Sequence, residues 1–501
     1  MPKSNQTFSL ATEERHFFKT VYNAAFANPF SRLRERLDRR IAGLFPSAPR
    51  RKSIDMCIQE VDLRLEALER ENKGKITAYS PGDQELLRVV YLFSIFHKFR
   101  DKFDKHIRDQ IQAGDTPIQI DFLDEAKEVI VEKGFDEDKF YHYFALSFQL
   151  RRAFYFISNS LVGISPCMRT LKKHLWYNVF TYNFKLYDKF LWNRMEDFST
   201  LLLGETGTGK GTAANAIGRS GFIPLDPRNK CFAQSFTRAF SSLNLSQYPE
   251  TLLESELFGH TKGAFTGAVE NYQGAFARCS PYGAILLDEI GEIPNHVQIK
   301  LLRVLQERHF TPVGAHRASR FNGRVIAATN RPREDIMGGK VFRDDFYYRL
   351  CSDLIEVPPL RKRIREAPEE LDLLLDFVIH RMTGAHASNL IEKVKRIIDR
   401  NLGKHYQWPG NVRELEQCVR SVLLRRDYAG KETLGSPNAD PSRNLVRGIE
   451  NRTIAVPDLV SGYCSVLYDD LGTYEKVARK TGLDRRTVKK YISGTTPKKD
   501  K

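Results

Sequence analysis

The sequence predicts an α/β core that follows a mainly helical N-terminal region and precedes two smaller helical regions. Three observations lead to this prediction. Apolar residues recur at one-face helix spacing within residues 1–160, as in Ile54, Ile58, Val61, Leu65 and Leu68. Short apolar strands then alternate with helical stretches and Gly-rich turns from 161 to 365, a pattern typical of a parallel sheet. Residues 366–428 and 459–501 are again helical in pattern, and a polar stretch, residues 429–458, is the predicted linker between them.

Length and composition are those of a globular protein with several domains. The chain has 501 residues, of which 41% are hydrophobic and 28% charged. No apolar run approaches the ~18 residues that would span a bilayer. The polar N-terminus also lacks the apolar segment of a signal peptide. We therefore expect a cytoplasmic protein without a membrane partner.

The charge balance favours a polyanionic partner. Lysine and arginine outnumber aspartate and glutamate by 78 to 62, a formal net charge of +16. Such an excess attracts nucleic acid, although a solubilising surface has the same composition. The seven cysteines stand singly, at positions 57, 167, 231, 279, 351, 418 and 464. This spacing indicates reduced thiols and argues against structural zinc or a disulfide framework.

Residues 1–160 show no catalytic constellation. Ser53 is the expected N-cap of the helix that carries the apolar series above. A second helical stretch follows Ser80-Pro81 as far as Ile107, and a third spans Tyr141–Ile157. The many aromatic residues here favour a packed core over a ligand pocket.

A phosphate-binding loop follows the strand predicted at Thr200–Leu203. Glycines in a Gly-x-x-x-x-Gly-Lys loop let backbone N–H groups surround a phosphate, and the lysine reaches the β- and γ-phosphates. Gly211 stands where a Ser or Thr commonly binds Mg²⁺, so Mg²⁺ must depend more on acidic residues, with Thr212 a weak substitute. The predicted ATP-binding residues are Gly204, Glu205, Thr206, Gly207, Thr208, Gly209, Lys210, Gly211 and Thr212.

Two further predicted strands end in polar residues. Asp288 and Glu289 follow the strand Ala284–Leu287, and Asn330 follows the strand Val325–Ala328. Ligands of open parallel sheets bind at this edge. We expect Asp288 to position Mg²⁺, Glu289 to polarise the attacking water, and Asn330 to bind the γ-phosphate or that water. Taken alone, these residues also fit a solvated strand end and a turn, but the phosphate loop upstream favours the catalytic interpretation.

Residues 254–268 read Glu-Ser-Glu-Leu-Phe-Gly-His-Thr-Lys-Gly-Ala-Phe-Thr-Gly-Ala. This run resembles the signature of the sigma-54-dependent transcriptional activators, the bacterial enhancer-binding proteins. Further motifs of that family recur in order at 291–294, 342–350, 358–361 and 408–415. The resemblance is continuous from 161 to 427. It implies an AAA+ P-loop ATPase core, with an α/β subdomain at 161–365 and a helical lid at 366–428.

The resemblance also implies a mechanism. It implies a homo-oligomeric ring, commonly a hexamer, that binds ATP between subunits and remodels the RNA polymerase holoenzyme containing sigma-54. Arg343 and Arg349 match the arginine fingers that reach a neighbour's γ-phosphate. Arg413 matches the sensor arginine of the lid, and Asn244 the asparagine that holds the catalytic glutamate. The residues that match the sigma-54-contacting loop are Gly263, Ala264, Phe265, Thr266, Gly267 and Ala268, with Phe265 the main apolar contact.

The sequence departs from the family at three places. Gly211 replaces an acidic residue common there. The segment before Gly204 is long, with an aromatic-rich insertion near 176–192, and a second insertion lies near 219–242. These departures affect nucleotide contacts and ring packing.

Residues 473–492 predict a helix-turn-helix that binds double-stranded DNA. Thr473 and Asp484 are the expected N-caps, and Gly482 the turn. A basic helical hairpin used for assembly has the same pattern, but the resemblance places a DNA-binding module here. The second helix is expected to present Arg485, Arg486, Thr487, Lys489 and Lys490 to the major groove and phosphates.

Two alternatives for the whole chain stay open. One is an AAA+ remodeller of another client, such as an unfoldase, although residues 263–268 argue against it. The other is a DNA-binding regulator that acts by occupancy without ATP hydrolysis, which only Gly211 favours. Residues 1–160 lack the acidic pair and strand-borne aspartate of a receiver domain, so we expect no phosphorelay control. A small-molecule or protein signal acting on this region is a hypothesis that rests on its size alone.

Overall fold

The computed structural model describes residues 8–45, 48–70, 75–403, 406–430, 442, 445–446, 449, 452 and 454–493. They form two compact units, residues 1–391 with 410–417, and residues 392–409 with 418–501. Helices α18 (Ser388–Asn401) and α19 (Asn411–Arg425) contribute to both units. Most of the predicted linker, residues 429–458, lies outside the described residues. Within the described part of the chain, every helix is too short or too polar to cross a membrane.

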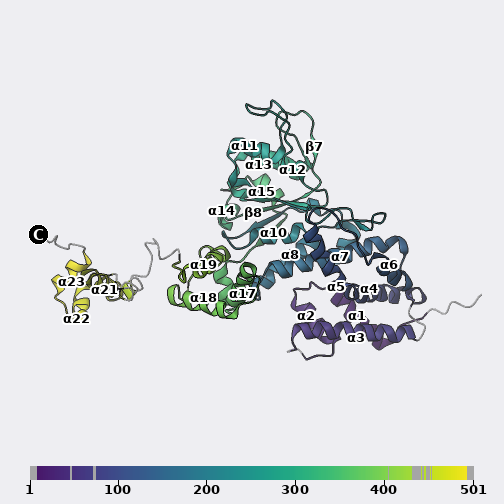
Figure 1. Cartoon of the computed structure of the whole chain (residues 1–501), viewed down its shortest axis with the longest axis horizontal. Helices are drawn as coiled ribbons and strands as arrows, with labels where there is room; N and C mark the ends of the chain where they lie inside the picture. The colour runs from purple at the N-terminus through teal and green to yellow at the C-terminus, as the bar shows by residue number, and fades with distance from the viewer. Residues whose placement is uncertain are drawn as a thin grey trace, which may run out of the picture. The chain divides into compact units, whose positions relative to one another are not determined.

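A five-stranded parallel sheet is the centre of the first unit (Figure 1). The strands predicted from sequence are present as β1, β5 and β8, so the α/β core is confirmed. Because all neighbours are parallel, the carboxyl ends of the strands share one edge of the sheet. The strand order is β4 (Phe240–Asn244), β5 (Ala284–Asp288), β8 (Arg324–Thr329), β1 (Thr200–Leu203) and β9 (Asp353–Glu356).

Strand alternation divides the apolar side chains between the two faces of the sheet. Leu202, Leu286 and Ile326 belong to one core, with α8 (Pro166–Phe180) and α10 (Lys210–Gly218). Leu201 and Ile285 belong to the other, with α11 (Glu250–Phe258), α13 (Asn295–Glu307) and α15 (Asp344–Leu350). Smaller elements complete this part of the chain: α9 (Phe184–Leu186), α12 (Ala275–Arg278), α14 (Arg333–Met337), η2 (Tyr187–Leu191), η3 (Met195–Asp197), η4 (Leu245–Gln247), η5 (Ile290–Glu292), and the hairpins β2 (Leu225–Asp226)–β3 (Cys231–Phe232) and β6 (His309–Phe310)–β7 (Ser319–Arg320).

The N-terminal region is helical, as predicted, but one cap is misplaced. The helix expected to start after Ser53 begins at Arg50, because Pro49 precedes it and the fixed φ of proline favours a helix start. The Ser53 Oγ donates to the Pro49 carbonyl at 3.0 Å and caps nothing. The stretch predicted from Ser80-Pro81 to Ile107 is divided at Phe99. The elements are α1 (Thr12–Phe26), α2 (Arg32–Ile41), α3 (Arg50–Arg70), η1 (Ile76–Ala78), α4 (Pro81–Lys98), α5 (Arg100–Ala113), α6 (Leu123–Glu132) and α7 (Glu137–Ser160).

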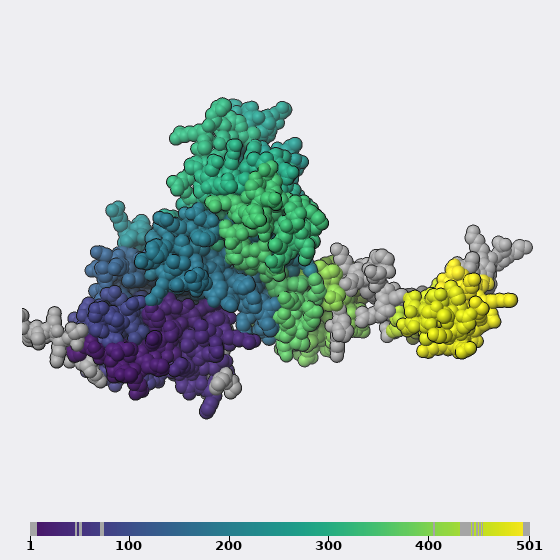
Figure 2. Space-filling view, turned by 180° about the vertical axis from the view of Figure 1, so that it is seen from behind, coloured from purple at the N-terminus to yellow at the C-terminus, as the bar shows by residue number. Residues whose placement is uncertain are grey.

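The N-terminal helices share one apolar core with α8, α10 and the sheet. Helix α7 packs along α10 and α8, and Figures 1 and 2 show the N-terminal residues adjoining that part of the chain. Both insertions noted in the sequence form this contact. In the first, the Trp192 ring lies 5.1 Å from His142 of α7, and in the second, Phe232 stacks at 4.4 Å on Phe148 of α7. The core is therefore continuous across residue 160.

The chain after β9 is helical in both units. In the first unit these are α16 (Leu360–Glu366) and α17 (Glu370–Thr383). In the second unit α21 (Val456–Leu471), α22 (Tyr474–Thr481) and α23 (Arg485–Ile492) pack around Cys464, Leu467, Val477 and Val488. Asp484 caps α23 as predicted, accepting from the Arg486 N–H at 2.8 Å. Thr473 stands at the N-cap of α22 but its side chain makes no capping bond, so that prediction is only half right.

Candidate functional site

The phosphate loop, residues 204–210, leaves the carboxyl end of β1 and enters α10. Gly207 and Gly209 have φ values of +80° and +102°, which residues with a Cβ rarely adopt. A Cβ on Gly207 would also lie 2.3 Å from the carbonyl oxygen of Gly410. Such a loop, directly before a helix N-terminus, presents backbone N–H groups to a bound phosphate.

Lys210 is the first residue of α10, and its side chain lies inside the loop. Its Nζ donates to the carbonyl oxygens of Gly204 at 2.8 Å and Glu205 at 3.3 Å. Burial lowers the pKa of Lys210, whereas the charges of Glu289 and Asp288 raise it. The ammonium group therefore lies within the field of both carboxylates, as the sequence predicts for a nucleotide site.

Asp288 and Glu289 stand at the end of β5. The Asp288 Oδ1 accepts from the Glu289 N–H at 3.0 Å. Glu289 has a φ of +56°, a strained conformation for a residue with a side chain, and such strain is common at functional sites. Its Oε2 is buried and has no hydrogen-bond partner among the described residues. Burial raises the pKa of Glu289, the Lys210 charge lowers it, and the charge of Asp288 raises it further. A buried carboxylate oxygen without a partner suits a proton acceptor or a ligand contact.

Two asparagines flank this carboxylate pair. Asn330, just beyond β8, donates from Nδ2 to the Thr206 Oγ1 of the phosphate loop at 3.3 Å. Asn244 is in register with Asp288 on the neighbouring strand. Its Oδ1 accepts from the backbone and hydroxyl of Ser246, at 3.1 and 2.8 Å. The predicted hold of Asn244 on Glu289 therefore stays a prediction. A pocket of about 520 Å³ opens here, lined by Leu245, Ser246, Tyr248, Glu250, Leu253, Glu289, Glu292, Pro294 and Asn330.

The start of α19 and the start of α16 close over the phosphate loop. Asn411 Nδ2 donates to the Glu205 carboxylate and to the Thr206 carbonyl, both at 3.1 Å. Arg361 binds the same carboxylate through both terminal nitrogens, and this lowers the pKa of Glu205. Arg413 lies near the loop, since a Cβ on Gly207 would be 3.0 Å from its Cβ. The sequence reading assigned no role to Arg361 or Asn411, although both lie in motifs of the resemblance.

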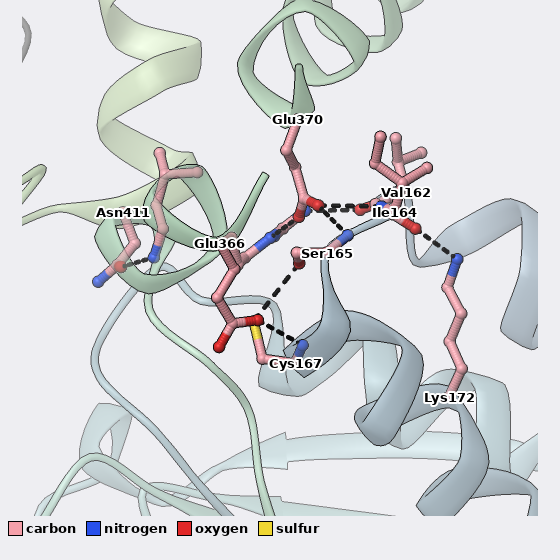
Figure 3. A network of polar contacts seen from close by, with 11 residues as sticks. Val162, Ile164, Ser165, Cys167, Lys172, Glu366, Glu370 and Asn411 are labelled. Atoms are coloured by element: carbon pink, nitrogen blue, oxygen red, sulfur yellow. Dashed lines mark hydrogen bonds and ion pairs between the residues drawn. The ribbon is translucent and has the colours of Figure 1, made fainter. Parts of the chain in front are cut away.

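Helices α16 and α17 also hold the junction between α7 and α8, residues 161–165 (Figure 3). Glu370 is fully buried and accepts from the N–H groups of residues 164 and 165, at 2.9 and 2.6 Å. It pairs at 2.5 Å with Arg363, which in turn donates to the carbonyl of residue 162. Glu366 accepts from the Cys167 N–H at 2.6 Å. One short helix, α16, therefore contacts both the phosphate loop and this junction.

The predicted arginine fingers lie at the two ends of α15. Arg343 precedes the helix, is exposed, and pairs with Asp345 at 2.9 Å. Arg349 is in the last turn, where its Nε donates to the Leu305 carbonyl at 3.0 Å. None of the hydrogen bonds or ion pairs recorded for the described residues joins either arginine to the phosphate loop of its own chain.

The loop of residues 263–268 is exposed at its tip and tied at its base. The Gly263 N–H donates to the Ala268 carbonyl at 2.9 Å, and Ala268 is buried. The Phe265 ring lies 4.9 Å from that of His260, which bridges to Val313 of the neighbouring turn. Phe265 remains 37% exposed, which leaves a large apolar side chain available to a partner.

The basic residues predicted to bind DNA lie on α23. Arg485, Arg486, Lys489 and Lys490 are exposed and Thr487 is partly exposed. Arg485 is shared with α22, since its Nε lies 2.7 Å from the Glu475 carboxylate. The other three cations make one basic helix face.

The chain is similar in sequence to known proteins. The family described as "Sigma-54 interaction domain" matches residues 185–356. The chain is 40% identical over 277 residues to the Nif-specific regulatory protein of Azotobacter vinelandii, covering 55% of this chain and 46% of that protein. It is 35% identical over 312 residues to the DNA-binding transcriptional regulator NtrC of Azospirillum brasilense, covering 60% of each. Against the DNA-binding transcriptional activator HyfR of Escherichia coli it is 42% identical over 231 residues, 46% of this chain and 32% of that protein.

The chain thus spans between a third and three fifths of the length of these relatives. A crystal structure of NtrX from Brucella abortus in complex with ATP aligns over 74% of this chain and 79% of that chain, at 19% identity and a TM-score of 0.40. Residues 185–356 are thus similar to the sigma-54 interaction domain, and the chain resembles sigma-54-dependent transcriptional regulators over the aligned residues.

Proposed function

We propose that this chain is a cytoplasmic, sigma-54-dependent transcriptional activator that binds DNA and hydrolyses ATP in an oligomeric ring, a hexamer by family resemblance. The observation that supports it most is the combination of a loop at 263–268 that exposes Phe265 with a phosphate loop that encloses Lys210, both within the residues similar to the sigma-54 interaction domain. We further propose the division predicted from sequence: N-terminal region 1–160, α/β subdomain 161–365, lid 366–428, linker 429–458 and DNA-binding domain 459–501.

The residues of the phosphate site have distinct roles in this proposal. ATP would supply the γ-phosphoryl group, and Mg²⁺ would neutralise negative charge on the phosphates. Lys210 and the loop N–H groups hold the phosphates, and Asp288 holds Mg²⁺. Glu289, whose pKa is raised by burial, accepts the proton of the attacking water, and Asn330 orients that water. Gly211 and Thr212 are both exposed in the first turn of α10, so the acidic pair carries most of the metal binding.

Hydrolysis depends on assembly in this proposal. Arg343 is exposed beside α15 and is free to exchange Asp345 for a phosphate of the adjacent subunit. A cation supplied by a neighbour stabilises transition-state charge that the chain alone does not. Arg349 and the lid arginine Arg413 complete the predicted set.

Different residues carry the two proposed partner contacts. Phe265 is the proposed contact to sigma-54, because it is a large ring, 37% exposed, in a loop whose ends are joined by the Gly263–Ala268 hydrogen bond. Helices α22 and α23 form the proposed helix-turn-helix, with Arg486, Lys489 and Lys490 on the face that meets double-stranded DNA.

The test mixes the full chain with purified sigma-54, with and without ADP–aluminium fluoride, and follows the complex by size-exclusion chromatography. We expect a complex only with the trapped nucleotide, and none with the Phe265→Ala variant, whose ATP hydrolysis should be unchanged. ATP hydrolysis without any complex would support the ATPase activity but exclude sigma-54 as its partner. No hydrolysis and no complex, with DNA still bound, would favour a regulator that acts by occupancy.

A further inference from the structure

The end of the phosphate-binding helix is held by the N-terminal region. Helix α10 carries Lys210 at its N-terminus and ends at Gly218, and α7 packs along it. The second and third residues after α10, Ser220 and Gly221, lie against α7. Their carbonyl oxygens both accept hydrogen bonds from side chains of α7.

Two fully buried polar side chains make these bonds. Gln149 donates from Nε2 to the Ser220 carbonyl at 2.9 Å, and its amide also exchanges hydrogen bonds with the Tyr187 hydroxyl at 2.7 and 3.0 Å. Arg152 donates from Nη2 to the Gly221 carbonyl. Gln149 and Arg152 are each 1% exposed, so water does not compete for these contacts.

Burying the Arg152 guanidinium is energetically unfavourable, although it binds one carbonyl. Its guanidinium lies 5.3 Å from the centre of the Phe148 ring and 5.4 Å from that of Phe236. Its Nε has no hydrogen-bond partner among the described residues, and burial lowers the pKa of Arg152 to about 9. A buried cation held by a carbonyl and two rings is commonly less stabilising than an apolar side chain of similar volume. Stability alone therefore does not account for an arginine here.

The contact of α7 with residues 220 and 221 affects Lys210, at the other end of α10. An α-helix is a stiff rod with a rise of about 1.5 Å per residue, so a displacement of one end of this short helix reaches the other. At Gly218 there is no free space, since a Cβ there would lie 2.3 Å from the Phe240 ring. A hold on residues 220 and 221 therefore sets how far Lys210 advances toward Asp288 and Glu289.

We propose that Arg152 and Gln149 are positioning residues for the nucleotide site, through which the N-terminal region sets the axial position of α10. This inference rests on the proposed nucleotide-dependent function. It also states how a ligand of residues 1–160 would act: any shift of α7 would change nucleotide affinity without a contact to the nucleotide. A fragment lacking residues 1–160 cannot test this, because the apolar core continues across residue 160.

The test compares the full-length Arg152→Met variant with Arg151→Met. Arg151 is the adjacent residue of α7 and pairs with Asp104 at 2.5 Å, a contact internal to the N-terminal region. Both substitutions remove one arginine from the same turn, but only one touches the chain after α10. Calorimetry with Mg²⁺–ADP measures the dissociation constant and the stoichiometry separately, and hydrogen exchange of the α10 amides is measured without nucleotide.

We expect Arg152→Met to raise the ADP dissociation constant about fivefold to tenfold at unchanged stoichiometry, which is part of the contribution of one charge-assisted hydrogen bond. It should also speed exchange in α10, whereas Arg151→Met should stay within about twofold of the wild type in both measurements. Arg152→Lys, which keeps the charge and a donor, should recover part of the affinity. A lower stoichiometry at an unchanged dissociation constant would show a merely structural role and overturn the inference.

A second variant covers the case in which Arg152→Met does not fold. Gln149→Met removes the neutral bond to the Ser220 carbonyl and should raise the dissociation constant in the same direction, and an unchanged value would overturn the inference. If the wild type itself bound no ADP, the proposed function would fail. Hydrogen exchange of the α10 amides would then test by itself whether Arg152 and Gln149 hold the end of α10.

Discussion

The buried Glu370 gives the sharpest test of how α17 is joined to the junction at residues 161–165. Glu370→Gln keeps the shape of the side chain but removes its charge. The carboxylate accepts from two backbone N–H groups and from Arg363, and all three of these partners are donors. An amide has one oxygen acceptor, and its NH₂ group would face donors that it cannot satisfy.

The magnitude follows from burial. The side chains of Glu370 and Arg363 are 0% and 4% exposed, so the variant leaves a buried cation without its partner. Removing one member of a buried pair costs about 3–5 kcal/mol. Glu366→Gln is the matched control, because it changes an exposed residue nearby that accepts from the Cys167 N–H. Its cost should be about 1 kcal/mol or less.

Two measurements check this difference. Urea unfolding of the first unit measures the change in its free energy of unfolding. Hydrogen exchange at residues 164 and 165 measures the change in the free energy of local opening. Both are needed because a chain of several units need not unfold in one step. If Glu370→Gln and Glu366→Gln lower the free energy of unfolding equally, within about 0.5 kcal/mol, the pair does not join α16 and α17 to the junction. The reasoning from burial would then be refuted.

The pH dependence has a definite sign. Burial raises the pKa of Glu370, but the Arg363 charge and the hydrogen bonds outweigh it, so the net pKa is lowered. A carboxylate with a lowered folded-state pKa contributes fully above its unfolded value of about 4.3 and loses this contribution as the pH falls through the folded value. The stability gap between wild type and Glu370→Gln should therefore be constant near neutral pH and narrow below about pH 4.

Three further changes test the phosphate site and the DNA surface. Glu289→Gln should keep nucleotide binding and lower ATP hydrolysis about 10²-fold or more, and unchanged turnover would exclude Glu289 as the base. Gly207→Ala should weaken Mg²⁺–ADP binding about tenfold, because its φ is +80° and a Cβ would meet the Gly410 carbonyl at 2.3 Å; wild-type affinity by calorimetry would contradict the loop geometry. Arg486→Ala should weaken DNA binding about tenfold and reduce the salt slope by about one, with ATP hydrolysis unchanged; equal binding would remove Arg486 from the DNA surface.

The clustering of the proposed phosphate-site residues was predictable because these residues lie next to strand ends. Lys210 follows β1 by one loop, and Asp288 and Asn330 stand at or just beyond the ends of β5 and β8. Once the apolar pattern predicts parallel strands, the carboxyl ends must meet at one edge, so local sequence places these residues together. The prediction that Ser53 caps a helix was wrong because local sequence does not single out one N-cap: several residues near a helix start satisfy the capping preference.

The sequence by itself determined the class of core, the phosphate loop and the exposed motif at 263–268. Only the tertiary structure decided which side chains hold the parts together. Glu205 meets Arg361 across 156 positions, and Glu370 meets the junction across more than 200. The two insertions read as departures from the family, and packing shows that they bind the N-terminal helices to the sheet. Periodicity reports which face of a helix or strand is buried, whereas a buried polar side chain takes its partner from whatever the folded chain brings within about 3 Å.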